Sequence, residues 1–483
     1  MPEGDISHSG RRLRRSTAGL VVLFLVSALA AYQFQLGPRW FGFDYPSPVT
    51  HPAEVAPPPG LTLPAARPPA TVAAPRPEEP GAGTAVRRAL AALLRSKSLG
   101  PRVAVQVADL EDATVVYRHG PELVTPASTM KLLTTTAALS ALGPDHRFDT
   151  RVVTGSRGRS ITLVGGGDPL LEPAPVDAAT TYPQRADLQT LAQATAKALR
   201  GLGRTSVRLT YDATLFTGPA VSPYWRPSYV PDDVVSPISA LWVDEGRERA
   251  GYSGRSDDPA KDAAQVFAKA LAGQHVKVVG APRPAVAPQG AQELSTVHSA
   301  PLAQIVQHVL EVSDNEGAEV LARQTALAVG QSSSFDGGAR AVRSVLADLG
   351  VDLAGVTTHD GSGLSRRDRL HPQTLLSVIE TASDPDHPEL RAVVADLPVA
   401  GFTGSLAYRF DTGDRAGLGM VRAKTGTLTG VHGLAGTVTT EDGAVLAFVA
   451  VADRVKRRQT LDARAKLDEI AAALAGCACA ATP

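Results

Sequence analysis

The stretch Pro126-Ala127-Ser128-Thr129-Met130-Lys131-Leu132 decides how this sequence is interpreted. A mainly apolar run follows and is closed by Gly143-Pro144, which predicts a helix over residues 128–142. Ser128 and Lys131 stand three positions apart at the start of that helix, so their side chains share one face within hydrogen-bonding reach. A serine hydroxyl becomes a good nucleophile when a neighbour takes its proton. The helix dipole and partial burial both lower the pKa of a lysine placed there, which makes Lys131 the candidate base.

The same spacing has an ordinary interpretation, a serine that caps a helix followed by a surface lysine, so the pair needs support from elsewhere. Ser313-Asp314-Asn315 stands in a break between two predicted helices and contains the only asparagine of the 483 residues. A simple helix cap and turn would use the same residue types, but it would not explain why the single asparagine stands here. Ser313 can relay a proton, and the Asn315 amide can both donate to and accept from a peptide.

A third motif, Lys424-Thr425-Gly426, lies in a predicted strand over residues 421–428. The lysine offers positive charge to a substrate carboxylate, the threonine offers a hydroxyl, and the glycine lets another backbone approach the strand closely. Taken alone, this tripeptide would be an ordinary strand end. In this chain the motifs S-x-x-K, S-x-N and K-T-G occur in the order that is typical of penicillin-binding proteins and β-lactamases. They also lie on the expected elements, which are a helix start, an interhelical loop and a strand.

The sequence around the motifs resembles the D-alanyl-D-alanine carboxypeptidase/endopeptidase family, the class C low-molecular-mass penicillin-binding proteins. The matching stretches are 126–132, 165–169, 313–315 with Ala318-Glu319, 360–365 and 424–428. The resemblance covers roughly residues 86–475 and includes a large insertion between the S-x-x-K and S-x-N motifs. One departure is Gly404-Ser405-Leu406, where Gly-Thr-Leu is expected, and this position is predicted to lie outside the catalytic set.

The resemblance also implies roles for the motif residues. The catalytic residues would be Ser128, Lys131, Ser313 and Asn315. The substrate-binding residues would be Lys424, Thr425, Gly426 and Thr427. The serine of the first motif would be the acylated nucleophile and its lysine the base, while the S-x-N residues would assist proton transfer and hold substrate. The lysine and threonine of K-T-G would receive the terminal carboxylate, and the backbone N–H groups of Ser128 and Thr427 would form the oxyanion hole.

The order of predicted elements favours an α+β fold, because strands near both ends of the folded region enclose a mainly helical middle. The expected strands are 103–107, 114–117, 421–428, 434–440 and 445–451. The resemblance implies a serine β-lactamase/DD-peptidase-like domain, an antiparallel sheet with flanking helices that carries a large inserted domain. The expected parts are this domain at 84–146 and 297–476, the insertion at 147–296 and a tail at 477–483. No candidate chemistry is predicted within the insertion.

The beginning of the chain has the pattern of a secretory signal or membrane anchor. Arginines at 11, 12, 14 and 15 precede an apolar run over residues 18–32, which contains an A-x-A-like cleavage site. Residues 1–43 are therefore expected to direct an extracytoplasmic protein of the cell envelope and, if uncleaved, to hold it to the membrane. Residues 44–83, rich in proline and alanine, are expected to form a disordered linker.

Composition excludes several other classes of function. The 48 basic and 48 acidic residues leave no formal net charge, so a nucleic-acid partner is not expected. Cys477 and Cys479 are the only cysteines, and their spacing predicts that they are too close for an ordinary disulfide. Neither H-E-x-x-H nor a Cys/His cluster occurs in the sequence, so no metal and no cofactor are expected.

The expected function is a serine D-Ala-D-Ala carboxypeptidase, with or without DD-endopeptidase activity, that acts on peptidoglycan stem peptides and is acylated by β-lactams. A class A β-lactamase is one alternative, but it needs a glutamate with a nearby asparagine between S-x-N and K-T-G, and the chain has no second asparagine. A catalytically silent penicillin-binding or wall-binding module is another alternative. Such a module would not need Ser128, Lys131 and Lys424 together.

Overall fold

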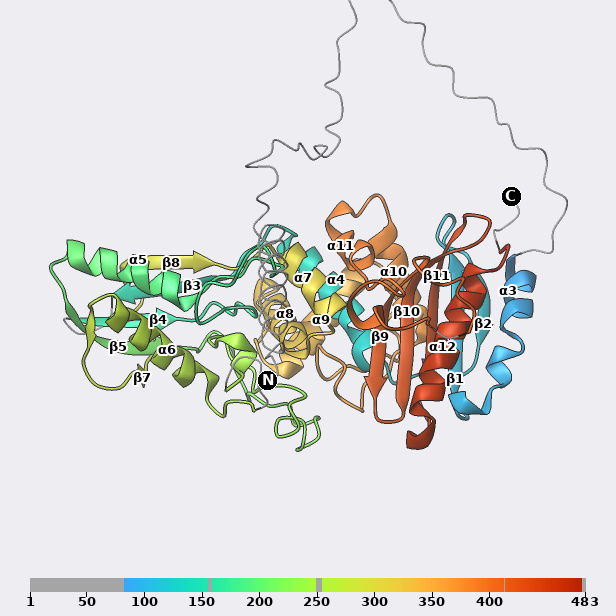
Figure 1. The fold of residues 1–483 in the computed structure, drawn as a ribbon, viewed down its shortest axis with the longest axis horizontal. Helices are drawn as coiled ribbons and strands as arrows, with labels where there is room; N and C mark the ends of the chain where they lie inside the picture. Colours follow the sequence, from blue (N-terminus) through green and yellow to red (C-terminus); the bar gives the residue numbers. More distant parts are fainter. Residues whose placement is uncertain (1–81, 155–158, 249–253, 412, 480–483) are drawn as a thin grey trace, which may run out of the picture. The chain divides into compact units, whose positions relative to one another are not determined.

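The computed structural model describes residues 82–479, apart from 155–158, 249–253 and 412 (Figure 1). The expected leader, 1–43, and all but the last two residues of the expected linker, 44–83, lie outside the described residues. Among the helices that are described, none is long and apolar enough to cross a membrane.

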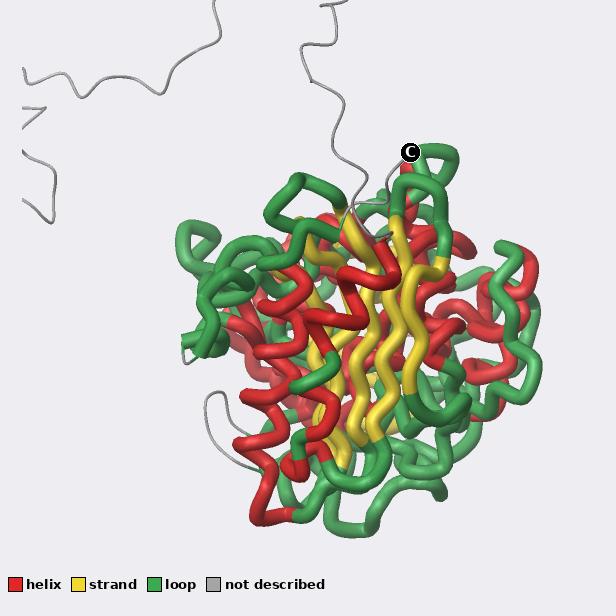
Figure 2. The backbone as a smooth tube through the Cα atoms, turned by 90° about the vertical axis from the view of Figure 1, so that its right-hand side faces the viewer, coloured by secondary structure: helices red, strands yellow, loops and turns green. Residues whose placement is uncertain are grey.

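An antiparallel sheet of five strands, in the order β2-β1-β11-β10-β9, joins the two ends of the described chain (Figure 2). The strands are β1 (Val103–Asp109), β2 (Val115–His119), β9 (Val421–Leu428), β10 (Val431–Thr439) and β11 (Val445–Ala452). Along one row of the sheet Val105 is opposite Ala450, Ala450 is opposite Leu434, and Leu434 is opposite Thr425. The predicted α+β fold, with strands from both ends in one sheet, is confirmed.

Both faces of this sheet are covered by helices, as Figure 2 shows. Leu446 and Phe448 of β11 pack in a core with α3 (Ala82–Leu90) and α12 (Thr460–Ala475). Their neighbours Ala447, Val449 and Val451 belong to a second core on the opposite face. Successive residues of a strand point to opposite faces, so burial on both sides explains why β11 is a continuous apolar run.

The helices that position the site pack in that second core. They are α4 (Met130–Leu142), α7 (Leu302–Glu311), α8 (Asn315–Ala328), α9 (Phe335–Asp348), α10 (Pro372–Ser383) and α11 (Ala392–Ala395). Every residue from Met130 to Leu139 is buried, because α4 is surrounded by its neighbours rather than lying on the surface. A buried helix needs no polar stripe, which explains the lack of amphipathic spacing in this part of the sequence.

A second, mixed sheet lies in the stretch between α4 and α7. Its strands are β3 (Asp149–Thr154), β4 (Ser160–Val164), β5 (Ser206–Asp212), β6 (Lys277–Val278), β7 (Arg283–Pro284) and β8 (Glu293–His298), in the order β6-β5-β4-β3-β8, with β7 also pairing with β5. Two helices, α5 (Leu188–Gly201) and α6 (Pro259–Gly273), pack with it in a separate core. Asp187 and Asp258 cap the N-termini of these helices. The side chain of each accepts a hydrogen bond from the backbone N–H three positions later, that of Thr190 or Lys261, and this fixes where each helix begins.

The chain between β5 and α6 packs differently from the rest of this stretch. Trp225, Tyr229, Ile238 and Trp242 belong to the same core as α4 and α8 and not to the core of the second sheet. The middle of the expected insertion therefore shares its packing with the helices that carry the motifs. The domain boundaries at 84–146, 147–296 and 297–476 stay predictions.

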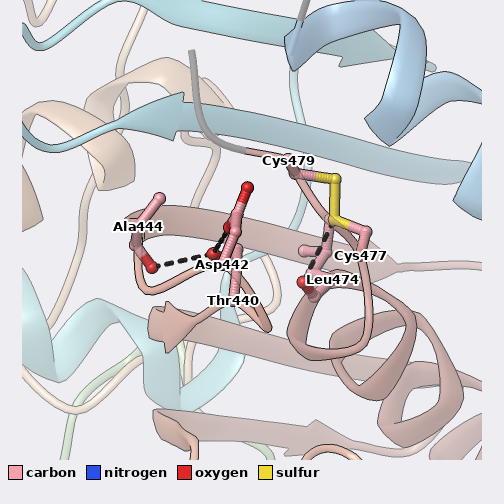
Figure 3. The surroundings of a disulfide bond; sticks show 6 residues. All are labelled: Thr440, Asp442, Ala444, Leu474, Cys477 and Cys479. Carbon is pink, nitrogen blue, oxygen red and sulfur yellow. Dashed lines mark hydrogen bonds between the residues drawn. A yellow bond between two sulfur atoms is a disulfide. The ribbon is translucent and has the colours of Figure 1, made fainter. Parts of the chain in front are cut away.

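The expectation that the two cysteines cannot pair is wrong. Cys477 and Cys479 form a disulfide immediately after α12 (Figure 3). The backbone bends there, and the two Cα atoms lie 5.2 Å apart, within the range that disulfides use. Cys479 is fully buried in the core shared by α3 and α12, so the chain remains packed four residues beyond the helix.

Candidate active site

Ser128 lies in a short 3-10 turn, Ala127–Thr129, that leads directly into α4. Its hydroxyl oxygen accepts a hydrogen bond of 2.9 Å from Lys131 Nζ. Ala127, just before it, has φ of 49°, in the left-handed region that residues other than glycine rarely occupy. Thr129 braces the same turn by donating to the Pro126 carbonyl at 2.8 Å. Such a strained backbone persists only where its surroundings fix it, so the turn presents Ser128 in one direction.

Lys131 is fully buried, and its ammonium group has three acceptors. Besides Ser128 Oγ these are Asn315 Oδ1 at 2.8 Å and the Ser362 carbonyl at 2.9 Å. Burial lowers the pKa of Lys131 to about 8, although nearby carboxylates, Asp314 first, act in the opposite direction. About a tenth of this lysine is then neutral at pH 7, against roughly one part in three thousand for an ordinary lysine. Lys131 can therefore serve as a proton acceptor near neutral pH.

The S-x-N motif is held at the start of α8. Asp314 caps the helix by accepting from Gly317 N at 3.0 Å, which places Asn315 in the first turn. The Asn315 amide is used at both ends, because Oδ1 accepts from Lys131 and Nδ2 donates to the Val234 carbonyl at 2.8 Å. Ser313 has φ of 62°, a second strained position next to the site.

Glu319 follows Asn315 by one helical turn and is also buried. Its carboxylate accepts from the backbone N–H of Gly361, at 3.1 Å to each oxygen, and from that of Ser362 at 2.8 Å. The Ser362 carbonyl in turn accepts from Lys131. Burial raises the pKa of Glu319 to about 7, and the charge of Asp360 acts in the same direction. One face of α8 thus holds Lys131 directly through Asn315 and indirectly through Glu319.

Asp360 folds the loop that contains Ser362. One carboxylate oxygen accepts from Gly363 N at 2.8 Å, and the other accepts from Ser365 N at 2.6 Å and Trp225 Nε1 at 2.8 Å. Gly363 has φ of +80°, and a Cβ atom there would lie 1.9 Å from the Ala127 carbonyl oxygen. Only glycine fits this position, because the loop packs directly behind the turn that carries the nucleophile.

The K-T-G strand, β9, runs close to the same turn. A Cβ atom on Gly426 would lie 2.9 Å from the Pro126 carbonyl oxygen, so the missing side chain allows the two backbones to approach. Thr425 Oγ1 donates to Ser405 Oγ at 3.0 Å. Ser405, which was expected to lie outside the catalytic set, thus contacts the threonine of the motif, and its place outside that set stays a prediction.

Lys424 lies deeper than the sequence suggests. The side chain is fully buried, and Nζ donates to the Thr425 carbonyl at 3.2 Å. Burial lowers its pKa well below the usual value, and the charge of Lys131 lowers it further. Lys424 is opposite Ala435, which packs in the core with α4, so the charge of Lys424 lies on the face of β9 that is turned toward Lys131.

A cleft of about 440 Å³ brings the motifs together. Its lining residues are Ser128, Tyr229, Val234, Ser313, Asn315, Leu364, Thr425, Thr427, Leu428 and Thr429. Five of the eight residues selected from the sequence thus share one surface. Lys131, Lys424 and Gly426 are buried next to it and do not line it.

Sequence reasoning missed the contribution of the stretch 147–296, where it expected no candidate chemistry. Tyr229 and Val234 line the cleft, and Trp225 holds Asp360. Val234 acts through its carbonyl, which leaves no side-chain pattern to find. Trp225 offered a weak signal, because it is one of only three tryptophans in the chain.

Comparison with known proteins identifies the family of the chain. The description "D-Ala-D-Ala carboxypeptidase 3 (S13) family" belongs to the family profile that matches residues 86–250 and 247–474. The carboxypeptidase DacB of Mycolicibacterium smegmatis is 35% identical over 480 residues, which cover 97% of this chain and 99% of that protein. A carboxypeptidase of Mycobacterium tuberculosis is also 35% identical, over 82% of this chain and 84% of its own.

A solved structure shows the same fold. Penicillin-binding protein 4 (dacB) of Haemophilus influenzae superimposes with a TM-score of 0.65 at 21% identity, covering 79% of this chain and 98% of that one. The family expected from the motifs is therefore confirmed by sequence, and the fold by structure. The chain belongs to the D-Ala-D-Ala carboxypeptidase 3 (S13) family of peptidases.

Proposed function

We propose that this chain is a serine-type D-Ala-D-Ala carboxypeptidase that works through an acyl-enzyme on Ser128. The observation that carries the proposal is the hydrogen bond of 2.9 Å from the buried Lys131 to the hydroxyl of Ser128, which lines the cleft. A serine needs a neighbouring base to become nucleophilic, and a lysine with a pKa of about 8 is one.

In acylation, neutral Lys131 takes the proton of Ser128 Oγ while that oxygen bonds to the carbonyl carbon of the penultimate D-Ala. The carbonyl oxygen becomes an oxyanion, for which the backbone N–H groups of Ser128 and Thr427 are the proposed donors. The C–N bond to the terminal D-Ala then breaks. Its nitrogen receives the proton held by Lys131, with Ser313 as the proposed relay, and D-Ala leaves while an ester remains on Ser128.

Deacylation reverses the roles with water in place of the amine. Lys131 takes one proton from water as the water oxygen bonds to the ester carbonyl carbon. The ester C–O bond breaks, and Ser128 Oγ regains a proton from Lys131. Asn315 keeps the lysine nitrogen in place through both steps, because its own amide is fixed by the Val234 carbonyl.

The terminal carboxylate of the substrate is assigned to the K-T-G strand. Thr425 and Thr427 line the cleft, and the hydroxyl pair Thr425–Ser405 lies beside them. Lys424 would contribute its charge from beneath the surface of the cleft, because its side chain is fully buried on the α4 face of β9. A carboxylate bound at Thr425 would favour the protonated lysine, since an opposite charge raises the pKa of an amine.

The natural substrate proposed is a peptidoglycan stem peptide that ends in D-Ala-D-Ala. A β-lactam presents a reactive carbonyl and a carboxylate in a similar arrangement, so it is expected to acylate Ser128 as well. Such a substrate lies outside the cytoplasm, which agrees with the export signal predicted over residues 1–43. The same proposal includes that this segment is either cleaved or retained as a membrane anchor.

The proposal is tested by incubating the purified chain with a stem-peptide analogue that ends in D-Ala-D-Ala and measuring released D-Ala. The wild type and a Ser332→Ala control, which removes an exposed hydroxyl away from the cleft, should release D-Ala. Ser128→Ala should release none while remaining folded. Fast penicillin turnover without release of D-Ala would instead favour a β-lactamase.

A further inference from the structure

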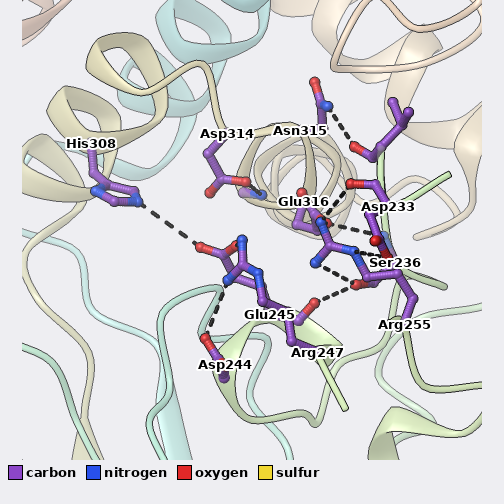
Figure 4. A network of polar contacts seen from close by, with 12 residues as sticks. Asp233, Ser236, Asp244, Glu245, Arg247, Arg255, His308, Asp314, Asn315 and Glu316 are labelled. Carbon is purple, nitrogen blue, oxygen red and sulfur yellow. Dashed lines mark hydrogen bonds and ion pairs between the residues drawn. The ribbon is translucent and has the colours of Figure 1, made fainter. Parts of the chain in front are cut away.

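A cluster of charged side chains lies directly behind the S-x-N motif (Figure 4). It borders a separate cavity of about 390 Å³, to which Ser313 and Asn315 also contribute. We call it the rear cluster and define it by Arg185, Glu245, Arg247, Arg255, His308, Asp314 and Glu316. The mechanism proposed above uses none of these side chains in a chemical step.

The three arginines of the rear cluster are already engaged by carboxylates. Arg247 pairs with Glu245 at 2.6 Å and also with Asp244, and Arg255 pairs with Glu316 at 3.1 Å. Arg185 pairs with Glu172, outside the cluster. Counted with these partners, carboxylates outnumber guanidinium groups.

Asp314 is a buried member of the rear cluster whose carboxylate is not fully satisfied. Its side chain is only 7% exposed, and Oδ1 accepts from Gly317 N. Oδ2 has no hydrogen-bond partner among the described residues. An unpartnered buried carboxylate oxygen is costly, and a bound cation is one way to satisfy it.

Glu245, His308 and Asp314 converge on one point, as Figure 4 shows. Each offers one ligand atom, and these atoms all lie within 4.8 Å of one another. His308 Nε2 is 4.0 Å from Glu245 Oε1. Imidazole nitrogen and carboxylate oxygen are donors that Zn²⁺ accepts, and binding would draw these three donor atoms closer to one another.

We propose that Glu245, His308 and Asp314 together bind one Zn²⁺ ion, or a divalent transition metal of similar chemistry. The three ligands come from the short turn at Asp244–Gly246, from α7 and from the cap of α8. Such a site has no consecutive motif, which is why the sequence did not suggest a metal. It goes beyond the peptidase activity, because the ion would lie behind the cleft and would not touch the substrate.

The ion would stabilise the turn that carries Ser313 and Asn315. Asp314 stands between these two residues and caps α8 with its other oxygen, so a metal on Oδ2 would fix the turn from behind. It would also act on Lys131, because the charge of Asp314 is the largest carboxylate effect that raises the pKa of that lysine. A bound cation would offset this charge and increase the neutral fraction of Lys131.

The test uses the untagged full chain, treated with a chelator and dialysed, to which Zn²⁺ alone is added. Calorimetry and elemental analysis should give one Zn²⁺ per chain, and the melting temperature should rise with Zn²⁺. Asp314→Asn keeps an oxygen for the Gly317 cap but loses the charge, and His308→Gln removes the imidazole. Each variant should lose the bound ion while keeping its circular-dichroism spectrum in chelator.

His387→Gln is the matched control, because His387 pairs with Glu389 at 3.1 Å on a more exposed part of the chain. It should bind Zn²⁺ as the wild type does. The proposal is overturned if the wild type binds no Zn²⁺, or if the two rear-cluster variants bind it as tightly as the control. Should one variant fail to fold, the other decides. Because binding is measured without substrate, the result does not depend on the proposed peptidase mechanism.

Discussion

Lys131 Nζ donates to Asn315 Oδ1 across 2.8 Å, and this hydrogen bond joins the start of α4 to the start of α8. The same nitrogen also donates to Ser128 Oγ and to the Ser362 carbonyl. Three acceptors favour the protonated lysine, whereas complete burial disfavours it. Burial has the larger effect, and the pKa falls to about 8. The site therefore holds a lysine that is oriented by hydrogen bonds and still able to lose its proton.

Acylation should depend on pH through this lysine. Neutral Lys131 is the base, and its fraction grows as pH rises toward its pKa of about 8. The rate of acylation by a labelled penicillin should rise about tenfold per pH unit below that value and level off above it. Rapid-mixing measurements from pH 6 to 9 provide the profile.

The matching variant is Lys131→Arg, which keeps a positive charge but effectively cannot release a proton. It should lose acylation nearly as completely as Lys131→Ala. An arginine variant that acylates at close to the wild-type rate would show that Lys131 acts only through its charge.

Glu319 is expected to be a positioning residue for Lys131. Its negative charge raises the pKa of the lysine, so Glu319→Gln should move the midpoint of the pH–rate profile to lower pH. The shift should appear mainly above pH 7, because Glu319 itself has a pKa of about 7 and loses its charge below that.

Glu380→Gln is the control for that variant, since Glu380 is half-buried in α10 and its charge is not among those that act on Lys131. It should leave the midpoint unchanged. If Glu319→Gln lowers the rate equally at every pH, the residue supports the fold of the loop and not the protonation of the lysine.

Lys424 should matter for substrates that carry a carboxylate. Lys424→Met keeps most of the volume in a fully buried position and removes the charge. Acylation by a D-Ala-D-Ala peptide and by penicillin should fall about ten- to hundredfold, as expected for losing one charge-assisted interaction of roughly 1.5–3 kcal/mol. A peptide analogue with a neutral terminal amide should lose much less. Equal losses for acid and amide would assign Lys424 to the chemistry or to the fold.

Comparing Gly363 with Gly350 separates two effects of adding a side chain, which are backbone strain and steric collision. Both have φ near +80°, so alanine at either position pays the left-handed backbone penalty of about 1–3 kcal/mol. A Cβ at Gly350 meets nothing within 4 Å, whereas one at Gly363 would collide with the Ala127 carbonyl. Urea unfolding should show a greater loss of stability for Gly363→Ala, and only this variant should slow acylation. Equal effects of the two substitutions would contradict the close packing behind Ser128.

Sequence alone predicted the fold class and the surface shared by the motifs, because both depend on local patterns. The β11 residues formed a long apolar run, and Ser128 and Lys131 were tied by helical spacing. The sequence could not predict hydrogen bonds that backbone atoms make between distant segments of the chain. The Val234 carbonyl that holds Asn315, and the Ser362 carbonyl that holds Lys131, have no signature in residue type.

Two other differences have a similar origin. Ser405 was noted only as a departure from the expected Gly-Thr-Leu, and the fold brings its hydroxyl to 3.0 Å from that of Thr425. Lys424 was expected to meet a carboxylate directly, because spacing along a strand does not reveal how deeply a side chain is buried. Burial depends on what packs over the strand, and the covering segments are far away in sequence.

The most direct test of the account is to identify the residue that penicillin acylates. The full chain is incubated with a labelled penicillin, its intact mass is measured, and the adduct is located by peptide mapping. We expect one adduct per chain, on the peptide that contains Ser128, and none on a folded Ser128→Ala variant. An adduct on Ser313 or another residue, or no adduct at all on the wild type, would contradict it.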